Sequence, residues 1–263
     1  MSYCPRMTAT PLSVTIITKN EGDRLDRCLE ALRGLADEIV VVDSGSTDDT
    51  MAVAQRLGAR VEQHVWNGYG PQKRAAEDYA HTDWILNLDA DEVATPTLVQ
   101  EIKALMAIGP PLRAYRFKIR NVYPGKDRPR WLADSHNYVR LYDKRAVRFR
   151  ESAVHDTVDT KDEAVGQLKG TATHFSVRSW EHVRRKHDAY TTLQAQTLRK
   201  PKWWILLRLP FEYPATFLRY YIFRGHFTGG WDGIYTSHLA SLARIMRLRK
   251  MLAARRAAAS AQA

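Results

Sequence analysis

Three carboxylates follow directly on an apolar run in the first half of the chain. The run Trp84–Leu88 has the length of a buried strand. It is followed at once by Asp89, Asp91 and Glu92. Like charges grouped beside a core strand repel one another, and burial adds a desolvation cost. A divalent cation with oxygen ligands, shared with a diphosphate, would relieve that cost; the competing interpretation is a turn whose acidic residues cap the next helix.

Two further polar clusters also follow strand-like apolar runs. The pair Asn20-Glu21 comes after Leu12–Thr18. The segment Asp43–Asp48 comes after Glu38–Val42. Helix-like periodicity separates these runs, and alternating strands and helices predict a parallel sheet with helices on both faces. Ligands bind such sheets beyond the carboxyl ends of the strands, so we expect the three clusters to converge on one binding site.

The pattern changes after residue 95. Before it, Arg60–Trp66 adds a third strand to the predicted parallel sheet. After it, segments that alternate apolar and polar residues, such as Tyr115–Ile119, predict half-exposed strands. The stretch Tyr123–Asn137 is rich in Gly, Pro, Arg and Trp and is predicted to be a mobile loop over the site. We therefore expect one α/β domain over residues 12–175.

The excess positive charge lies in the last third of the chain. The 263 residues carry a formal net charge of +11. Residues 176–263 hold 16 Lys and Arg against 4 Asp and Glu, a net of +12, whereas the preceding part holds 24 basic and 25 acidic side chains. This distribution predicts a separate surface that meets an anionic partner.

The same region has the composition of an interfacial segment. Aromatic clusters at Trp203–Leu207 and Phe217–Phe223 alternate with arginines, and Pro210 and Pro214 interrupt this segment. Such segments lie on anionic membrane surfaces. The alternative is a helical cap with solvated arginines. Nucleic acid is not the expected partner, because no recognisable binding motif accompanies the charge.

Cysteine content and hydropathy indicate the compartment. Cys4 and Cys28 are the two cysteines and make no disulfide framework, which favours a reducing compartment. The first residues contain no signal-peptide run, and no stretch offers eighteen uninterrupted apolar residues. We expect a cytoplasmic protein that lies peripherally on the inner face of the cytoplasmic membrane.

The polar clusters together carry a family resemblance. The segments are LSVTIITKNEGDRLDRCLEAL, EIVVVDSGSTDDT, GYGPQKRAAEDYA and WILNLDADE. They resemble the nucleotide half of family 2 glycosyltransferases with the GT-A fold, and more closely the bacterial lipopolysaccharide core glucosyltransferases. The resemblance extends more loosely through RLYDKRAVRFRESAVHDTV, THFS and GHFTGGWDGI. It implies a Rossmann-like, mostly parallel GT-A sheet with helices on both faces, followed by a basic helical extension.

The resemblance also implies roles for matched residues. Nucleotide binding falls to Thr18, Glu21, Asp43, Ser46, Asp48, Lys73 and Asp89. Asp91 and His155 would hold Mg²⁺ or Mn²⁺, and Asp156 would accept the proton of the acceptor hydroxyl. Relatives often carry Glu where this chain has Asp156, so the shorter side chain leaves the identity of the base open. The alternatives without a role in catalysis are that Asp43 only caps its own loop and that His155 is a structural, hydrogen-bonding histidine.

Three residues of the predicted loop are candidates for contact with the acceptor: Trp131, Asp134 and His136. Asp134 is also a rival for the role of general base. Trp131 and His136 could stack on or hydrogen-bond a sugar, or could simply pin the loop. By the resemblance, residues 12–95 form the nucleotide-sugar half, 96–175 the acceptor half, and 176–263 the extension at the membrane surface.

The resemblance implies an inverting, metal-dependent transfer of a hexose, with glucose from UDP-glucose favoured, to the lipopolysaccharide inner core, an anionic glycolipid. One alternative keeps the fold but uses a polyprenyl phosphate or another cell-envelope glycan as acceptor. A nucleotidyltransferase fits less well, because TKNEGD is a poor match to a glycine-rich opening loop. A non-catalytic membrane-binding module is a fourth hypothesis, against which the intact Asp89, Asp91 and His155 argue.

Overall fold

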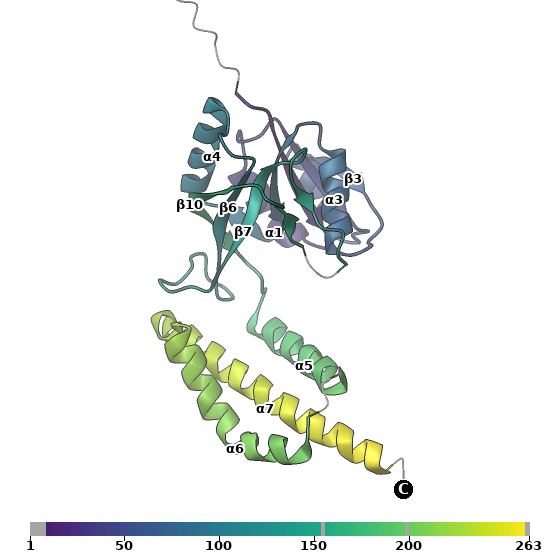
Figure 1. Cartoon of the computed structure of the whole chain (residues 1–263), viewed down its shortest axis with the longest axis vertical. Coiled ribbons are helices and arrows are strands. Elements are labelled where there is room, and N and C mark those ends of the chain that lie inside the picture. Colours follow the sequence, from purple (N-terminus) through teal and green to yellow (C-terminus); the bar gives the residue numbers. More distant parts are fainter. Residues whose placement is uncertain (1–8, 154–155, 198–199, 261–263) are drawn as a thin grey trace, which may run out of the picture. The chain divides into compact units, whose positions relative to one another are not determined.

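The structure is a computed structural model that describes residues 9–153, 156–197 and 200–260 (Figure 1). The chain forms two compact units. The first comprises the described parts of Met1–Arg120 and Ser135–His174. The second comprises those of Asn121–Asp134 and Phe175–Ala263.

An eight-stranded sheet in the order β3-β2-β1-β4-β7-β6-β10-β5 forms the centre of the first unit. Its first four strands are parallel: β1 (Leu12–Thr18) lies between β2 (Glu38–Asp43) and β4 (Trp84–Asp89), and β3 (Arg60–Gln63) pairs with β2. Their β-branched and aliphatic residues are buried almost throughout, as in a sheet covered on both faces. The predicted buried strands are therefore confirmed.

The remaining strands extend this sheet with antiparallel pairings. β7 (Ser135–Asp143) runs antiparallel to β4 and to β6 (Ala114–Asn121). β10 (Val165–His174) runs antiparallel to the short β5 (Glu92–Ala94), which follows β4 after a single turn. The last residues of β10 thereby lie beside the chain that leaves β4.

Helices cover both faces of the sheet, as the sequence predicts. On one face α1 (Gly22–Ala31), α2 (Thr50–Arg56) and α4 (Pro96–Ile108) share a core with Val14 and Ile16 of β1. Side chains alternate between the two faces of a strand, so the intervening residues of β1 point the other way.

The opposite face is covered by α3 (Tyr69–Tyr79). Ala76 of this helix packs with Ile17 at the end of β1. A two-stranded ribbon of β8 (Arg148–Phe149) and β9 (Val158–Asp159) lies on the same side, because Phe149 and Val158 share a cluster with residues of β4, β6 and β7. The α/β class predicted from the sequence is thus confirmed.

The second unit is built from helices. They are α5 (Trp180–Thr197), α6 (Lys202–Leu218), the π-helical turn η1 (Arg219–Phe223), the 3₁₀ turn η2 (His226–Gly229) and α7 (Gly230–Ser260). Helix α7 packs against both α5 and α6. None of the helices in the described part of the chain has the length and apolarity needed to cross a bilayer.

Pro210 and Pro214 interrupt the aromatic and basic segment in the sequence but do not end its helix. Helix α6 runs through both prolines. Each proline removes one backbone hydrogen bond and crowds the carbonyl of the residue four positions earlier. Both prolines are exposed, so water can reach the carbonyls that lose their partners.

The loop Asn121–Asp134 groups with these helices, although the sequence places it in the first domain as a mobile flap. The hydroxyl of Tyr123 lies 2.7 Å from Nδ1 of His226, and Oδ2 of Asp134 lies 3.3 Å from Nε2 of the same histidine. His226 is buried. These contacts fasten the loop to η2, the turn that precedes α7.

Candidate active site

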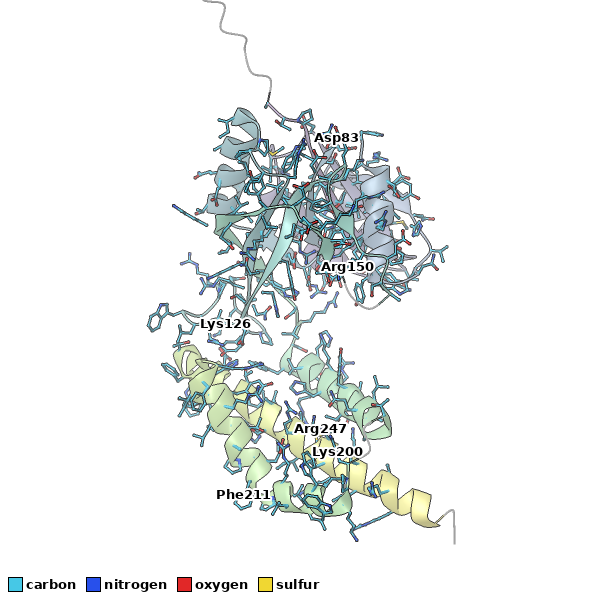
Figure 2. All side chains as sticks on the ribbon, in the orientation of Figure 1. Asp83, Lys126, Arg150, Lys200, Phe211 and Arg247 are labelled. Carbon is cyan, nitrogen blue, oxygen red and sulfur yellow. The ribbon has the colours of Figure 1, made fainter. Side chains whose placement is uncertain are left out.

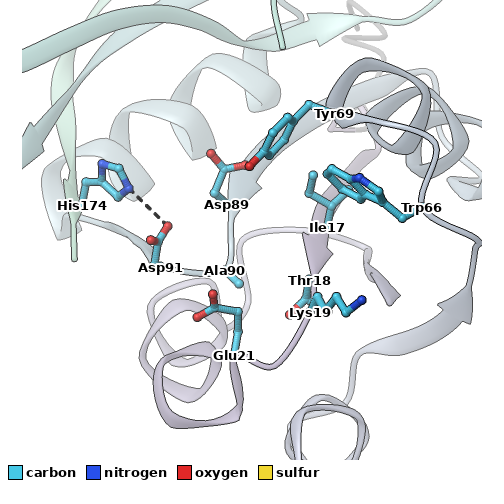
Figure 3. A pocket seen from close by; sticks show the side chains of 10 residues that line it. All are labelled: Ile17, Thr18, Lys19, Glu21, Trp66, Tyr69, Asp89, Ala90, Asp91 and His174. Carbon is cyan, nitrogen blue, oxygen red and sulfur yellow. Dashed lines mark ion pairs between the residues drawn. The ribbon is translucent and has the colours of Figure 1, made fainter. Parts of the chain in front are cut away.

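A cleft of about 460 Å³ lies at the carboxyl ends of β1 and β4 (Figure 3). It is lined by Ile17, Thr18, Lys19, Glu21, Trp66, Tyr69, Asp89, Ala90, Asp91 and His174. Two of the three predicted polar clusters, those after β1 and β4, therefore meet in one place. The cleft lies entirely within the first unit.

The third cluster, after β2, stabilises the turn after β1 that lines the cleft. Asp43 is fully buried and accepts hydrogen bonds from the backbone N–H groups of Gly45 at 2.8 Å and Ser46 at 2.7 Å. The hydroxyl of Ser46 accepts the N–H of Asn20 at 2.8 Å, and Asp48 accepts an N–H from the start of each of the helices α1 and α2. These bonds match the alternative in which Asp43 caps its own loop, and they tie that loop to the turn after β1.

Asp91 and His174 form a pair on the wall of the cleft, drawn as a dashed line in Figure 3. Oδ1 of Asp91 lies 3.4 Å from Nε2 of His174, and the two side chains are 18% and 24% exposed. Burial alone would raise the pKa of Asp91, but the hydrogen bond from His174 and the charge of Arg24 lower it below its usual value. Burial alone would lower the pKa of His174, but Asp91 outweighs it and raises that pKa.

The sequence reasoning missed His174 and chose His155, which lies outside the described residues. His174 stands within the THFS segment, at the end of a predicted strand. The antiparallel register of β5 and β10 places it opposite Glu92, one residue from Asp91. That register is set by tertiary pairing, which no local pattern encodes.

Two buried cations hold Asp89. Nζ of Lys73 lies 2.8 Å from Oδ1 of Asp89 and 2.8 Å from Oδ2 of Asp156. Nη2 of Arg140 lies 3.0 Å from Oδ2 of Asp89 and 3.2 Å from Oε1 of Glu92. Burial would raise the pKa of Asp89, but Arg140 and Lys73 hold it far below its usual range. Burial, with the charge of Asp89, raises the pKa of Glu92 to about 7.

Lys73 therefore occupies a different place from the one expected. The resemblance puts it against the nucleotide, but its side chain is fully buried and does not line the cleft. Two carboxylates, Asp89 and Asp156, compensate its charge, which is how a buried ammonium group is tolerated. Lys73 links the end of β4 to the segment that carries Asp156.

That segment is pressed against the start of α3. The N–H of Gly70 donates to the carbonyl of Ser152 at 3.0 Å, and the N–H of Tyr69 donates to the carbonyl of Ala153 at 3.2 Å. A Cβ at Gly70 would lie 2.0 Å from the carbonyl oxygen of Arg150, so only glycine allows this approach. The side chain of Asp156 is 39% exposed at the end of this segment.

Trp66 and Tyr69 form an aromatic wall that the sequence reasoning missed. Their rings are nearly perpendicular, with centroids 4.9 Å apart, and both are exposed in the cleft. Trp66 was predicted to end a strand, but β3 ends at Gln63 and leaves Trp66 in the following loop. Exposed aromatic faces of this kind can stack on a nucleobase or a sugar ring.

The three acceptor candidates are divided between the two units. Trp131 is 79% exposed and, with Asp134, belongs to the second unit, whereas His136 belongs to the first and stacks on Tyr138. Burial would raise the pKa of Asp134, but His226 and then Arg130 lower it. An aspartate engaged by two such partners is a poor proton acceptor, which argues against Asp134 as the general base.

Comparison with known proteins gives a consistent result. The family model for glycosyl transferase family 2 matches residues 13–160. An uncharacterised glycosyltransferase of Rickettsia typhi is 37% identical over 251 residues, which cover 91% of this chain and 86% of that protein. The lipopolysaccharide core biosynthesis glycosyltransferase LpsC of Rhizobium meliloti is 30% identical over 234 residues, 85% of each chain. Among solved structures, Staphylococcus aureus TarS in complex with UDP-GlcNAc has 19% identity and a TM-score of 0.47 over 71% of this chain and 66% of that one.

The buried arginine of the site should be essential for stability. Replacing Arg140 by Met leaves Asp89 and Glu92 without their shared cation, so the free energy of unfolding should fall by about 3–5 kcal/mol. Urea denaturation followed by circular dichroism measures this loss. Arg116→Met, at an exposed position on β6, is the matched control and should change stability by less than about 0.5 kcal/mol. Equal losses in the two variants would contradict the assignment.

Proposed function

Because the chain belongs to glycosyltransferase family 2, we propose that it transfers a hexose, glucose in the first instance, from a UDP-sugar to a lipopolysaccharide inner-core acceptor with inversion. The observation that carries this proposal is the pairing of Asp91 with His174 in the cleft, two residues after Asp89, whose charge is compensated by Lys73 and Arg140. The relative LpsC, which covers most of the chain, supports the choice of acceptor.

The ligands at the cleft fit a divalent cation. Asp91 offers a carboxylate and His174 an imidazole, a donor set that Mn²⁺ accepts and that Mg²⁺ tolerates. Within the described ranges no three His, Cys, Asp or Glu side chains are grouped to hold a metal by themselves. Asp91 and His174 would hold the ion together with the diphosphate of the donor. When bound, the cation supplies neutralisation of the charge that develops on the leaving diphosphate.

The chain itself binds and orients the donor. Trp66 and Tyr69 offer a face for the base or the sugar. Thr18 contributes a hydroxyl that has no hydrogen-bond partner among the described residues, at the end of β1 where the family contacts the nucleotide. The loop after β2, with Asp43 at its centre, keeps this part of the cleft in place.

Asp156 is the proposed general base. Its carboxylate is partly exposed, and the ion pair with Lys73 fixes its position relative to Asp89. A carboxylate so placed can accept the proton of an acceptor hydroxyl while that oxygen attacks the anomeric carbon and the bond to the diphosphate breaks. Because Lys73 is paired with both Asp89 and Asp156, one ammonium group connects the carboxylate proposed to meet the donor with the proposed base.

Metal-dependent binding of UDP should be lost without the cleft pair. Asp91→Ala and His174→Ala should each weaken UDP binding in the presence of Mn²⁺ by about tenfold or more, because each removes a metal ligand. Isothermal calorimetry with and without Mn²⁺ measures the effect. His136→Ala removes an exposed histidine of β7 and should leave the Mn²⁺-dependent affinity for UDP unchanged. Full Mn²⁺-dependent binding in Asp91→Ala would reject the metal site.

Loss of the proposed base should affect turnover and spare donor binding. Asp156→Asn keeps the size of the side chain but cannot accept a proton, so kcat should fall by about 10²- to 10⁴-fold. Glu151→Gln, at an exposed carboxylate of the same segment, is the control and should keep wild-type turnover. The assay follows UDP release with an inner-core glycolipid and, separately, a polyprenyl phosphate as acceptor. Unchanged kcat in Asp156→Asn would assign the proton to another group.

The second unit is proposed to contact an anionic membrane, on the inner face of the cytoplasmic membrane. Helix α6 presents an exposed apolar face at the helical spacing of three and four residues, formed by Trp203, Leu206, Leu207, Phe211 and Leu218. Figure 2 labels Phe211, one residue of this face. The opposite side, with Ile205, is buried against α7. Exposed Lys202 and Arg219 flank this face, as in helices that lie on anionic lipid.

Polar substitutions on this face should weaken membrane binding. Leu207 and Phe211 are 63% and 66% exposed, so Leu207→Ser with Phe211→Ser should not disturb the packing of the helices. Because burial of each side chain contributes about 1.5–3 kcal/mol, binding to phosphatidylglycerol vesicles should weaken by more than about tenfold. Vesicle co-sedimentation measures this. Leu193→Ser, at a 58% exposed position of α5, should bind as the wild type does, and equal binding by all three proteins would rule out α6 as the contact.

A further inference from the structure

A second pocket lies within the helical unit, apart from the residues used in sugar transfer. It measures about 230 Å³ and is formed by α5, η1 and α7. Its polar lining includes Arg244 and Arg247 of α7, Tyr220 of η1, and His187, Tyr190, Thr191 and Gln194 of α5. Figure 2 labels Arg247 on α7.

The charge of Arg247 is poorly compensated. Its side chain is 14% exposed, and its Nε is buried without a hydrogen-bond partner among the described residues. The carboxylate of Glu212 lies 3.9 Å from Nη2, beyond hydrogen-bond distance. Glu212 is already held by Nε and Nη2 of Arg208 at 2.9 and 2.7 Å. Burial, followed by the charge of Arg244, lowers the pKa of Arg247.

The pocket has an excess of cations. Arg244 lies one helical turn from Arg247, and no described residue that lines the pocket carries a carboxylate. A buried guanidinium without a full set of partners is costly, and two adjacent ones repel each other. An anion bound between them would remove both penalties. Since the pocket is a cavity open to solvent, such an anion can enter it.

We propose that this pocket binds a phosphate group between Arg244 and Arg247. Guanidinium groups match phosphate oxygens with paired hydrogen bonds. Two guanidinium groups are better compensated by a phosphate dianion than by a single carboxylate. The amide of Gln194 and the hydroxyl of Tyr220 offer neutral hydrogen bonds to the remaining oxygens. The phosphate can belong to a phospholipid headgroup or to a soluble phosphate ester, which share this chemistry. The proposal rests on the helical unit alone and does not require the sugar transfer.

The test uses nuclear magnetic resonance of the Nε–H groups of arginine in the full chain. The Arg247 signal is identified by its absence in Arg247→Gln. Titration with inorganic phosphate should move this signal and saturate. Arg244→Gln should weaken the apparent phosphate affinity by about tenfold, because a hydrogen bond to a charged group is lost. Arg249→Gln removes the same charge from an exposed position on α7 and should bind phosphate as the wild type does.

Two outcomes would overturn the proposal: an Arg247 signal that does not respond to phosphate, or equal weakening in Arg244→Gln and Arg249→Gln. Circular dichroism and Mn²⁺-dependent UDP binding of Arg244→Gln check that the chain is folded, and they keep this result separate from that of the sugar-transfer site. Glycerol 3-phosphate and dihexanoyl phosphatidic acid, kept below its micelle concentration, then distinguish the sources. Equal affinity assigns the site to the phosphate group itself, and tighter binding of the lipid assigns it to a phospholipid headgroup.

Discussion

The pairing of buried cations with Asp89 is the interaction on which the active-site edge depends. An ionised carboxylate at the end of a core strand would carry a desolvation penalty of several kcal/mol. Lys73 and Arg140 offset this penalty from two sides, so Asp89 stays charged beside two further carboxylates. Arg140 also donates to Asn87 within β4 at 2.6 Å, and Glu92 accepts the N–H of Asp89 at 3.1 Å. The strand end, its turn and its charge are therefore held by one network.

The two halves of the sheet contribute differently to the site. In the parallel half, the topology alone brings the turns after β1, β2 and β4 to the same edge of the sheet. The antiparallel half delivers His174 by close packing: the N–H of Gly170 donates to Glu101 at 2.8 Å, and a Cβ at Gly170 would lie 2.4 Å from the Cα of Leu98. Strand β10 can thus lie directly on α4, which fixes the position of its last residue. The side chain of His174, at the end of a strand held in this way, keeps a defined position beside Asp91.

Local sequence patterns were sufficient to locate residues of the cleft that lie at the end of a strand or directly after it. Thr18 and Asp91 were predicted as site residues because each closes or follows a strand-like run and matches a family motif, and both line the cleft. The partners that meet across the fold were not accessible in the same way. The proximity of His174 to Asp91 depends on β5–β10 register, and the burial of Lys73 depends on carboxylates from two other segments. The α/β class and sheet edge were predictable, whereas the pairing of side chains across them was not.

The two prolines inside α6 limit how deeply the backbone of this helix could enter a lipid bilayer. Because neither has an N–H, the backbone carbonyls of Leu206 and Pro210 lack their usual helical donors. Both carbonyls belong to the exposed stretch of the helix that carries Leu207 and Phe211. In hydrocarbon each unsatisfied carbonyl would cost several kcal/mol, whereas among hydrated headgroups water satisfies it. In the proposed contact with a bilayer, the backbone of α6 would therefore stay in the hydrated headgroup layer, and only its apolar side chains would reach the acyl chains.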